Sequence, residues 1–308
     1  MQLVFCGTPQ FAVPTLQALI DDRFQVSLVV TQPDRPQGRG LQLGVSPVKQ
    51  TALTLGLPVA QPDRIKNNEE FQQQLTRLKP DAIIVVGYGR IIPQWMIDLP
   101  PGGNINLHGS LLPKYRGAAP IQWAIASGET VTGVTTMRID AGLDTGDILL
   151  QRKVPVQPED TSETLAPRLA TIGAGLMIET LRGLQAKTLS PIPQDHSQAS
   201  LAPILKKEDG LVDFRLPAKQ ISDRLRGFQP WPGAFTKFRG KTLNIWRATM
   251  TEQDIPQGDL LVSDRVLVGC AGNTSLELIE LQPEGKKRML AADFVRGYRP
   301  KSGERLGS

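Results

Sequence analysis

The chain of 308 residues is poor in cysteine and histidine, with two of each. Cys6 and Cys270 lie far apart in apolar runs and form no C-x-x-C pair, which excludes a disulfide framework and a structural zinc site. We therefore expect no metal. Thiols of this kind are typical of a reducing, cytoplasmic setting.

Long apolar runs are absent as well. No stretch approaches the ~20 apolar residues of a membrane helix, and the first residues lack the charged region of a signal peptide. The N-terminus is predicted to be the first strand of a globular protein that needs no membrane. At roughly 100 to 200 residues per domain, the length suggests two domains.

The net charge of +5 is distributed unevenly. Residues 1–200 hold 17 Lys and Arg against 17 Asp and Glu, whereas residues 201–308 hold 18 against 13. This asymmetry suggests a polyanionic partner for the C-terminal third. Charge alone leaves open the alternative of a mildly basic surface with no such partner.

Short apolar runs alternate with helical periodicity over the first 90 residues, a pattern typical of βαβ units around a parallel sheet. Strands are expected at 3–7, 25–31, 57–61 and 81–87, and helices at 11–20, 47–55 and 67–78. Residues 32–46 contain three Gly and two Pro and have no periodicity, so this long loop is predicted to be functional or disordered.

The pattern changes near residue 200. Before it, we expect helices at 93–98, 119–126 and 162–184, a strand at 104–107, and a hairpin at 133–139 and 147–156. After it, a helix at 218–228 precedes strands at 234–238, 243–248, 259–262, 266–269 and 275–281. Evenly spaced short strands are typical of a small β-barrel of the oligonucleotide-binding (OB) type. We expect an α/β, Rossmann-like domain with an open, mostly parallel sheet at 1–186, a linker at 187–203, and an OB-like barrel domain at 204–308.

The densest polar cluster of the chain follows the strand at 104–107. Asn106 and His108 are two residues apart, so in a strand they project to the same face, at the carboxyl end where open α/β sheets bind ligands. A histidine at a strand end can equally be a packed structural residue. The cluster continues at Asp140, Asp144 and Asp147 on a Gly-rich turn. The alternatives are a solvated turn or a capping role for Asp147, and the spacing lacks the alternating ligands of an EF-hand calcium loop.

Several segments together resemble the formyltransferases that use 10-formyltetrahydrofolate. They are Asn106-x-His108, the Ser-Leu-Leu-Pro of 110–113, Arg-Gly-Ala-Ala-Pro from Arg116, and Gly-Leu-Asp-Thr-Gly-Asp from Gly142. Gly-Thr-Pro-Gln-Phe at 7–11, the segment 31–40, Phe-Gln-Pro-Trp-Pro-Gly-Ala-Phe at 228–235 and Pro-Glu-Gly-Lys-Lys at 283–287 resemble the branch of that family that acts on methionyl-tRNA. The resemblance covers nearly the whole chain.

The resemblance implies transfer of a formyl group from 10-formyltetrahydrofolate to the α-amino group of methionine on charged initiator tRNA. It makes Asn106, His108 and Asp144 the catalytic residues. An amide such as that of Asn106 can stabilise the oxyanion of acyl transfer. An imidazole can accept the proton of the amine or donate to the oxyanion, and the residues leave both roles open for His108. Asp144 would orient the imidazole.

The same resemblance implies which residues bind the folate and which bind the tRNA. The folate would lie along Ser110, Leu111, Leu112 and Pro113 and against the backbone of Val86, Gly87 and Tyr88, although core packing explains the two leucines equally well. Loop 32–46, with Arg35 and Arg39, would enter the acceptor stem, but Leu41-Gln-Leu43 stands where relatives are often Lys-rich. Candidate cations of the C-terminal domain are Lys206, Lys207, Arg215, Lys237, Arg239, Lys241, Arg247, Lys286, Lys287 and Arg288.

Two other functions are compatible with parts of the pattern. A formyltransferase acting on a nucleotide sugar or a purine precursor would share the catalytic residues but would not require the Arg-bearing loop or the basic C-terminal third. A non-catalytic RNA-binding protein on the same scaffold would be expected to have lost the polar triad, which is intact here. A monomer without an obligate protein partner is the expectation for the family.

Overall fold

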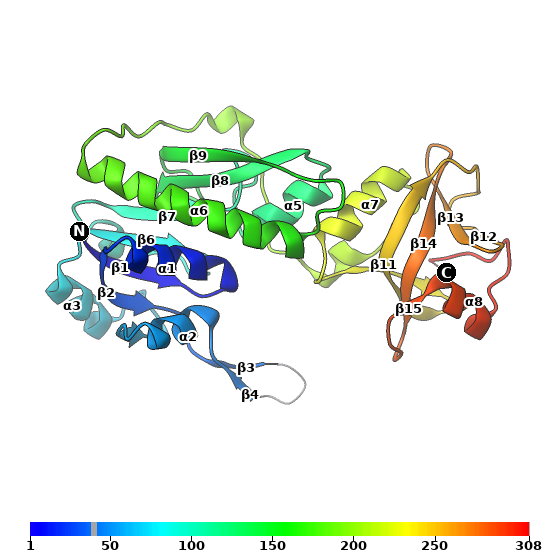
Figure 1. The fold of residues 1–308 in the computed structure, drawn as a ribbon, viewed down its shortest axis with the longest axis horizontal. Coiled ribbons are helices and arrows are strands. Elements are labelled where there is room, and N and C mark those ends of the chain that lie inside the picture. The colour runs from blue at the N-terminus through cyan, green and yellow to red at the C-terminus, as the bar shows by residue number, and fades with distance from the viewer. Residues whose placement is uncertain (38–41, 308) are drawn as a thin grey trace. The chain divides into compact units, whose positions relative to one another are not determined.

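The protein is described by a computed structural model that covers residues 1–37 and 42–307. Two compact units make up the chain (Figure 1). Unit 1 holds Met1–Pro120, Val131–Pro155 and Ala166–Pro203, and unit 2 holds Ile121–Thr130, Val156–Leu165 and Ile204–Ser308. The chain therefore passes between the units more than once, and residues 187–203, expected to be a linker, group with unit 1.

Unit 1 is built on a seven-stranded sheet with the order β5-β2-β1-β6-β7-β8-β9. Strands β5, β2, β1, β6 and β7 are mutually parallel, whereas β8 and β9 each run antiparallel to the preceding strand. The strands are β1 Gln2–Gly7, β2 Gln25–Val30, β5 Val59–Ala60, β6 Ala82–Val86, β7 Asn104–His108, β8 Val131–Arg138 and β9 Ile148–Pro155. The prediction of an open, mostly parallel sheet is confirmed.

Helices cover both faces of this sheet because its central strands are apolar on both sides. The helices of unit 1 are α1 Val13–Asp21, α2 Pro47–Thr54, α3 Glu69–Leu78, α4 Gln94–Ile97 and α6 Ser162–Gln185, of which α1 and α6 lie in front in Figure 1. Helix α5 Pro120–Ala126 belongs to unit 2 from Ile121 onward. One face packs Val4, Ile83 and Val85 against α3 and α4. On the other face α6 approaches β7 so closely that a Cβ on Gly173 would lie 2.7 Å from Leu107.

Unit 2 is an antiparallel sheet with the order β10-β11-β14-β13-β12, and β15 pairs with β14. The strands are β10 Ala234–Phe238, β11 Lys241–Thr251, β12 Leu260–Val262, β13 Val266–Cys270, β14 Thr274–Pro283 and β15 Met289–Leu290, and the helices are α7 Ala218–Gly227 and α8 Ala291–Tyr298. The C-terminal residues bridge the two edge strands: Leu306 N donates to Gly258 O before β12, and Gly307 N donates to Lys237 O of β10, both at 2.8 Å. The sheet thereby approaches a closed barrel, which agrees with the predicted antiparallel domain.

Four elements differ from the sequence-based expectation. Residues 35–37 and 42–44 form a short antiparallel pair, β3 Arg35–Gln37 and β4 Gln42–Gly44, in a loop expected to be functional or disordered. Strand β15 and helix α8 were not expected either. The three strands have two or three residues each, too few for hydrophobic periodicity to reveal them. Helix α8 has eight residues, as many as the predicted α2, so its length does not explain why it was missed.

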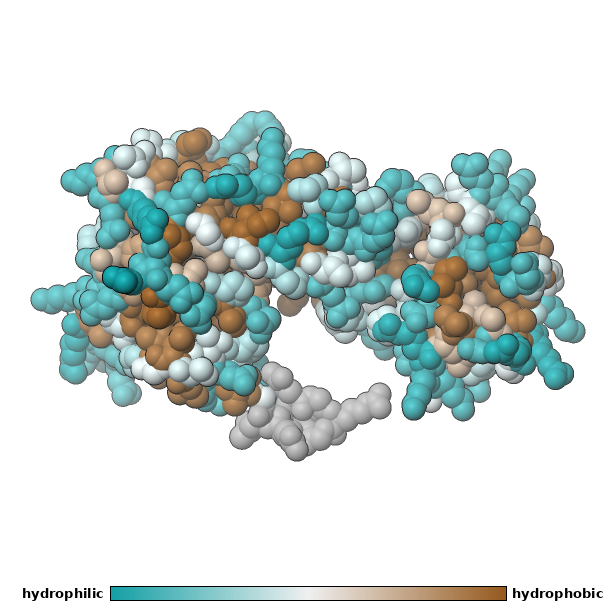
Figure 2. All heavy atoms as spheres, viewed as in Figure 1, coloured by the Kyte–Doolittle hydropathy of each residue, from teal (hydrophilic) through white to brown (hydrophobic). Residues whose placement is uncertain are grey.

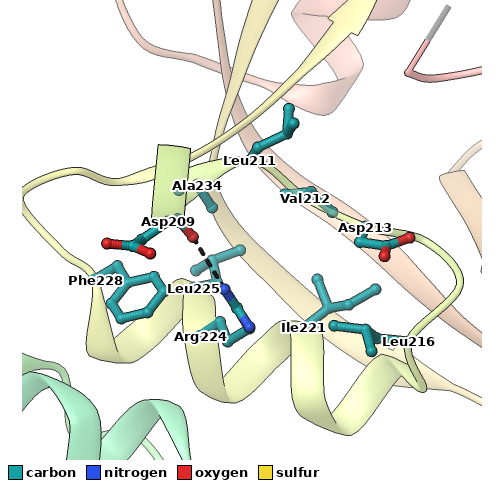
Figure 3. Close-up of a pocket in the computed structure, with 11 residues that line it drawn as sticks. Asp209, Leu211, Val212, Asp213, Leu216, Ile221, Arg224, Leu225, Phe228 and Ala234 are labelled. Atoms are coloured by element: carbon teal, nitrogen blue, oxygen red, sulfur yellow. Dashed lines mark hydrogen bonds between the residues drawn. The ribbon is translucent and has the colours of Figure 1, made fainter. Parts of the chain in front are cut away.

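A small void lies in the core of unit 2. Figure 3 shows it between α7 and the residues around Leu211, with Arg224 Nη2 donating to Asp209 O at 3.3 Å. Its volume is about 10 Å³. A cavity of that size holds about one water molecule, so this void is a packing feature and not a substrate site.

Both cysteine thiols are buried, and the burial raises the pKa of each, that of Cys270 to about 12. Because the thiolate is the reactive form, a raised pKa keeps both thiols protonated and inert across the neutral range. A disulfide reagent such as dithionitrobenzoate is expected to detect almost no thiol in the folded protein at pH 8 and both in guanidinium chloride. Rapid labelling of the native protein would contradict this description of the two cores.

Hydrophilic residues cover much of the surface visible in Figure 2, with apolar patches between them. Among the helices of residues 1–37 and 42–307, none combines the length and the hydropathy needed to cross a lipid bilayer.

Candidate active site

Strand β7 places two polar side chains at the carboxyl end of the parallel part of the sheet. Asn106 and His108 follow Asn104, whose side chain instead turns back to donate to Met96 O at 2.8 Å and Ile97 O at 3.0 Å. His108 is 5% exposed. The two-residue period of the strand thus directs Asn106 and His108 to one side of the sheet, as predicted.

Asp144 meets both of them from the loop between β8 and β9. Its Oδ1 accepts from Asn106 Nδ2 at 3.5 Å, and its Oδ2 lies 3.7 Å from His108 Nδ1. The same Oδ2 accepts from Gly117 N at 2.8 Å. Three side chains that are up to 38 residues apart in the sequence therefore converge.

The second ring nitrogen of His108 defines the tautomer. Nε2 lies 2.8 Å from Tyr115 O. A carbonyl oxygen only accepts, so Nε2 must carry the hydrogen and donate it. Nδ1 is then the nitrogen that faces Asp144, and a proton added there would be held next to a carboxylate.

The turn that carries Asp144 is closed by its own side chains. Asp140 accepts from Gly142 N at 3.1 Å and from Thr145 Oγ1 at 2.7 Å. Asp140 therefore stabilises the turn itself. In the part of the chain that the structure describes, no group of three metal-ligating side chains occurs.

The segment 110–113 is held tightly below the catalytic strand. Ser110 Oγ is fully buried and donates to Lys114 O at 2.6 Å, and Leu112 is 3% exposed. Leu111 and Pro113 are half-buried. Leu111 packs on Gly133, where a Cβ would lie 2.6 Å from its side chain. Ser110 and Leu112 are thus packed residues, whereas Leu111 and Pro113 keep some exposed surface.

The segment at the end of β6, residues 86–88, likewise contains both buried and exposed residues. Val86 and Tyr88 are buried, and burial raises the pKa of the Tyr88 phenol. Gly87 is exposed and has φ +55°, and a Cβ there would lie 2.9 Å from Pro9 Cγ. Only glycine suits this position, which leaves backbone atoms uncovered beside the sheet.

The candidate tRNA-binding cations fall into two classes. Arg35 begins β3, Arg39 lies outside the described residues, and Lys206, Lys207, Lys286 and Lys287 are exposed lysines of unit 2. By contrast Arg215 pairs with Asp213, Arg239 pairs with Glu304, and Arg288 stacks on the Trp246 ring at 3.7 Å. Internal pairing reduces the charge that Arg215 and Arg239 can offer to a polyanion.

Two buried polar residues near Asp144 were given no role by the sequence analysis. Gln194 is 6% exposed and Arg116 is 7% exposed, and they are hydrogen-bonded to one another. Gln194 also donates to the backbone oxygens of Asp144 and Gly146. Gln194 lies in a Pro- and Ser-rich segment without periodicity, so no sequence signal marked it.

Comparisons with known proteins find relatives that match this chain along its full length. The family model described as formyl transferase matches residues 1–181, and that of the formyl transferase C-terminal domain matches residues 204–299. The methionyl-tRNA formyltransferase of Koribacter versatilis is 64% identical over 100% of this chain and 99% of its own, and that of Acidobacterium capsulatum is 59% identical over 100% of both.

Among solved structures, the N-formyltransferase from Helicobacter canadensis in complex with folinic acid and dTDP-3-aminofucose has a TM-score of 0.69. It is 19% identical and the match covers 91% of this chain and 98% of that one, which shows a shared fold. With two family models in chain order and relatives of high identity along its full length, the chain belongs to the formyltransferase family.

Proposed function

We propose that this protein transfers the formyl group of 10-formyltetrahydrofolate to the α-amino group of methionine on initiator methionyl-tRNA. The observation that carries the proposal is the convergence of Asn106, His108 and Asp144 at the end of β7. Full-length similarity to methionyl-tRNA formyltransferases supports the choice of acceptor. The basic C-terminal third is consistent with it.

The geometry distributes the chemistry among the three side chains. When the amine attacks the formyl carbon, the C–N bond that forms leaves negative charge on the formyl oxygen. Asn106 Nδ2 donates to that oxygen, a role typically worth about 3 kcal/mol of transition-state stabilisation. His108 Nδ1 accepts the proton that the amine loses, because Nε2 is occupied by Tyr115 O. Asp144 stabilises the resulting imidazolium. The tetrahedral intermediate then collapses: the bond between the formyl carbon and N10 of the folate breaks, N10 takes up a proton, and tetrahydrofolate leaves.

Donor binding is proposed on the exposed parts of the two segments beside this triad. The uncovered backbone at Gly87 and the exposed surface of Leu111 and Pro113 would contact the folate. The buried residues Val86, Tyr88, Ser110 and Leu112 would support those contacts from below. We propose that the protein binds 10-formyltetrahydrofolate through these residues and without a metal.

tRNA binding is proposed to combine the loop at 32–46, through Arg35 and Arg39, with the exposed lysines of unit 2. The base of this loop is anchored because Asp34 forms an ion pair with Lys49, and this partner lowers the pKa of Asp34. Asp34 also accepts from Gln61 at 2.8 Å. We propose that the protein acts as a monomer in the cytoplasm, without an obligate protein partner.

The test is to incubate the purified protein with 10-formyltetrahydrofolate and methionyl initiator tRNA, then release the amino acid and measure N-formylmethionine. Parallel reactions replace the tRNA with a dTDP-amino sugar or with glycinamide ribonucleotide. Formylation of the methionyl-tRNA is expected. Formylation of a small acceptor in its absence would contradict the proposal.

Replacing Lys286 and Lys287 together with alanine is expected to raise KM for the tRNA and to leave kcat nearly unchanged, because these exposed lysines would contact phosphates and not the reacting atoms. The slope of log affinity against log salt should fall by about one for each phosphate contact that is lost. Arg296→Ala, which removes a cation paired with Asp293, is the control. Equal effects of both changes would contradict a specific role for the lysine pair.

A further inference from the structure

Residues 187–203, expected from composition to be a linker, contain a stretch whose backbone pairs with the start of β9 and with the loop that follows His108. Ile192 and Ile148 exchange two backbone hydrogen bonds of 2.8 Å at the start of β9. Farther along, Arg116 N donates to Ser200 O at 2.8 Å, and Ala202 N donates to Arg116 O at 2.7 Å. The segment is therefore built into unit 1 beside the loop of Asp144 and beside the loop that follows His108.

Gln194 is the side chain of this segment that reaches the catalytic loop. Its Nε2 donates to Asp144 O at 2.9 Å and to Gly146 O at 2.7 Å. Its Oε1 accepts from Arg116 Nη2 at 2.6 Å and from Arg116 Nε at 3.2 Å. Both amide hydrogens and the amide oxygen are thus engaged inside the protein, which fixes the orientation of the side chain.

Arg116 holds the other side of Gln194. Its guanidinium is buried, and its acceptors are the Gln194 amide oxygen and the Nδ1 of His196, at 3.1 Å. Burying a cation against acceptors that carry no negative charge is costly. The buried guanidinium therefore needs these hydrogen bonds, and they fix the position of the Gln194 amide.

The backbone of Asp144 needs such support. Its φ is +51°, in the left-handed region that residues with a Cβ adopt infrequently. Strained backbone of this kind persists only where the surroundings hold it. The Gln194 amide supplies hydrogen bonds on both sides of Thr145, at Asp144 and at Gly146.

We propose that Gln194, fixed by Arg116, is a positioning residue that holds the Asp144 carboxylate against Asn106 and His108. The proposal rests on the proposed function for its kinetic consequence, because a misplaced Asp144 would slow formyl transfer. Its geometric content, that Gln194 determines where Asp144 lies relative to the His108 ring, does not depend on which acceptor the enzyme uses.

Two variants separate the contacts of Gln194. Gln194→Ala removes all of them, whereas Gln194→Glu keeps an acceptor for Arg116 and loses both donors to the loop. Each is expected to lower kcat by about 10²-fold with little change in KM, since small misplacements of catalytic groups have effects of this size. The control is Gln198→Ala, in the same segment, where the exposed side chain donates to Asp195 at 2.8 Å. Wild-type kcat in Gln194→Glu would overturn the proposal.

A double-variant comparison tests whether Gln194 acts through Asp144. If it does, Gln194→Ala should have little further effect in a protein that already carries Asp144→Asn, because the group it positions is gone. Effects that multiply independently would overturn the proposal. A variant with unchanged kcat per folded molecule and only a lower Tm would overturn it as well.

A substrate-free measurement distinguishes failure of this inference from failure of the proposed function. The protein has two histidines, so a nitrogen-15 NMR spectrum of the imidazole rings contains two sets of signals. At fixed pH the His108 signals are expected to move in Gln194→Glu and to stay in Gln198→Ala. Unmoved His108 signals in Gln194→Glu would overturn the inference, whatever the acceptor assay shows.

Discussion

Replacing His108 with alanine is expected to lower kcat by about 10² to 10⁴-fold, the usual contribution of a general acid–base catalyst. The reason is the position of Nδ1, 3.7 Å from Asp144 Oδ2, where a transferred proton is stabilised. Binding of the tRNA should be nearly unchanged, since His108 is 5% exposed and offers little surface to a macromolecule. Single-turnover formylation and a separate tRNA-binding titration check the two expectations.

The variant His108→Gln separates the catalytic role of His108 from its hydrogen bond to Tyr115 O. Alanine also removes the donor to Tyr115 O, and the loss of one such hydrogen bond costs about 1 kcal/mol of folding stability. Glutamine can donate to that oxygen but cannot take a proton near neutral pH. We expect glutamine to restore stability and not activity. Recovery of kcat in His108→Gln would assign the histidine a structural role instead.

The second large effect is expected for Asn106→Ala. Loss of one preorganised oxyanion donor typically lowers kcat by about 10² to 10³-fold, which corresponds to about 3 to 4 kcal/mol. The amide lies on the strand beside His108, and its contact with Asp144 is long, at 3.5 Å, so its hydrogens can turn to a developing charge. The measurement is kcat at saturating donor and acceptor.

Asn104→Ala is the matched comparison on the same strand. Asn104 is 1% exposed, and its amide donates to Met96 O and Ile97 O, so its loss should reduce stability by about 1 to 3 kcal/mol. Its kcat per folded molecule should stay near that of the wild type. If Asn106→Ala and Asn104→Ala had the same kcat per folded molecule, Asn106 would not be the donor that stabilises the oxyanion.

The features that sequence predicted well are those set by local periodicity or by long motifs. The apolar run at 81–87 predicted a strand buried on both faces, and β6 is that strand. The two-residue period of β7 was enough to place Asn106 beside His108. The assignment of Asp144 to the same site as Asn106 and His108 came from the family resemblance, because no spacing rule connects residues so far apart.

Other features depended on tertiary contacts that no local pattern encodes. Residues 187–203 were expected to be a linker because their Pro, Ser and Gln show no periodicity, yet their backbone pairs with the start of β9 and with the loop after β7. Gln194 is buried only because Arg116 and the Asp144 loop surround its amide. Polar residues acquire such roles through partners distant in the sequence.

The exposure of the residues predicted to bind folate also depends on tertiary contacts that the sequence motif does not encode. The motif at 110–113 named four residues, but the structure separates the buried Ser110 and Leu112 from the partly exposed Leu111 and Pro113. A motif records which residues recur together. Which of them has free surface depends on packing against β8 and β9.

The central claim is that this triad formylates the α-amine of methionyl-tRNA. The most direct measurement supplies a folate donor with an isotopically labelled formyl group to the wild type and to His108→Gln in parallel, and locates the label by mass spectrometry. We expect the label on the methionine nitrogen of the initiator tRNA with the wild type, and almost none with the variant. Equal labelling by both proteins, or label recovered only on a small acceptor, would contradict the claim.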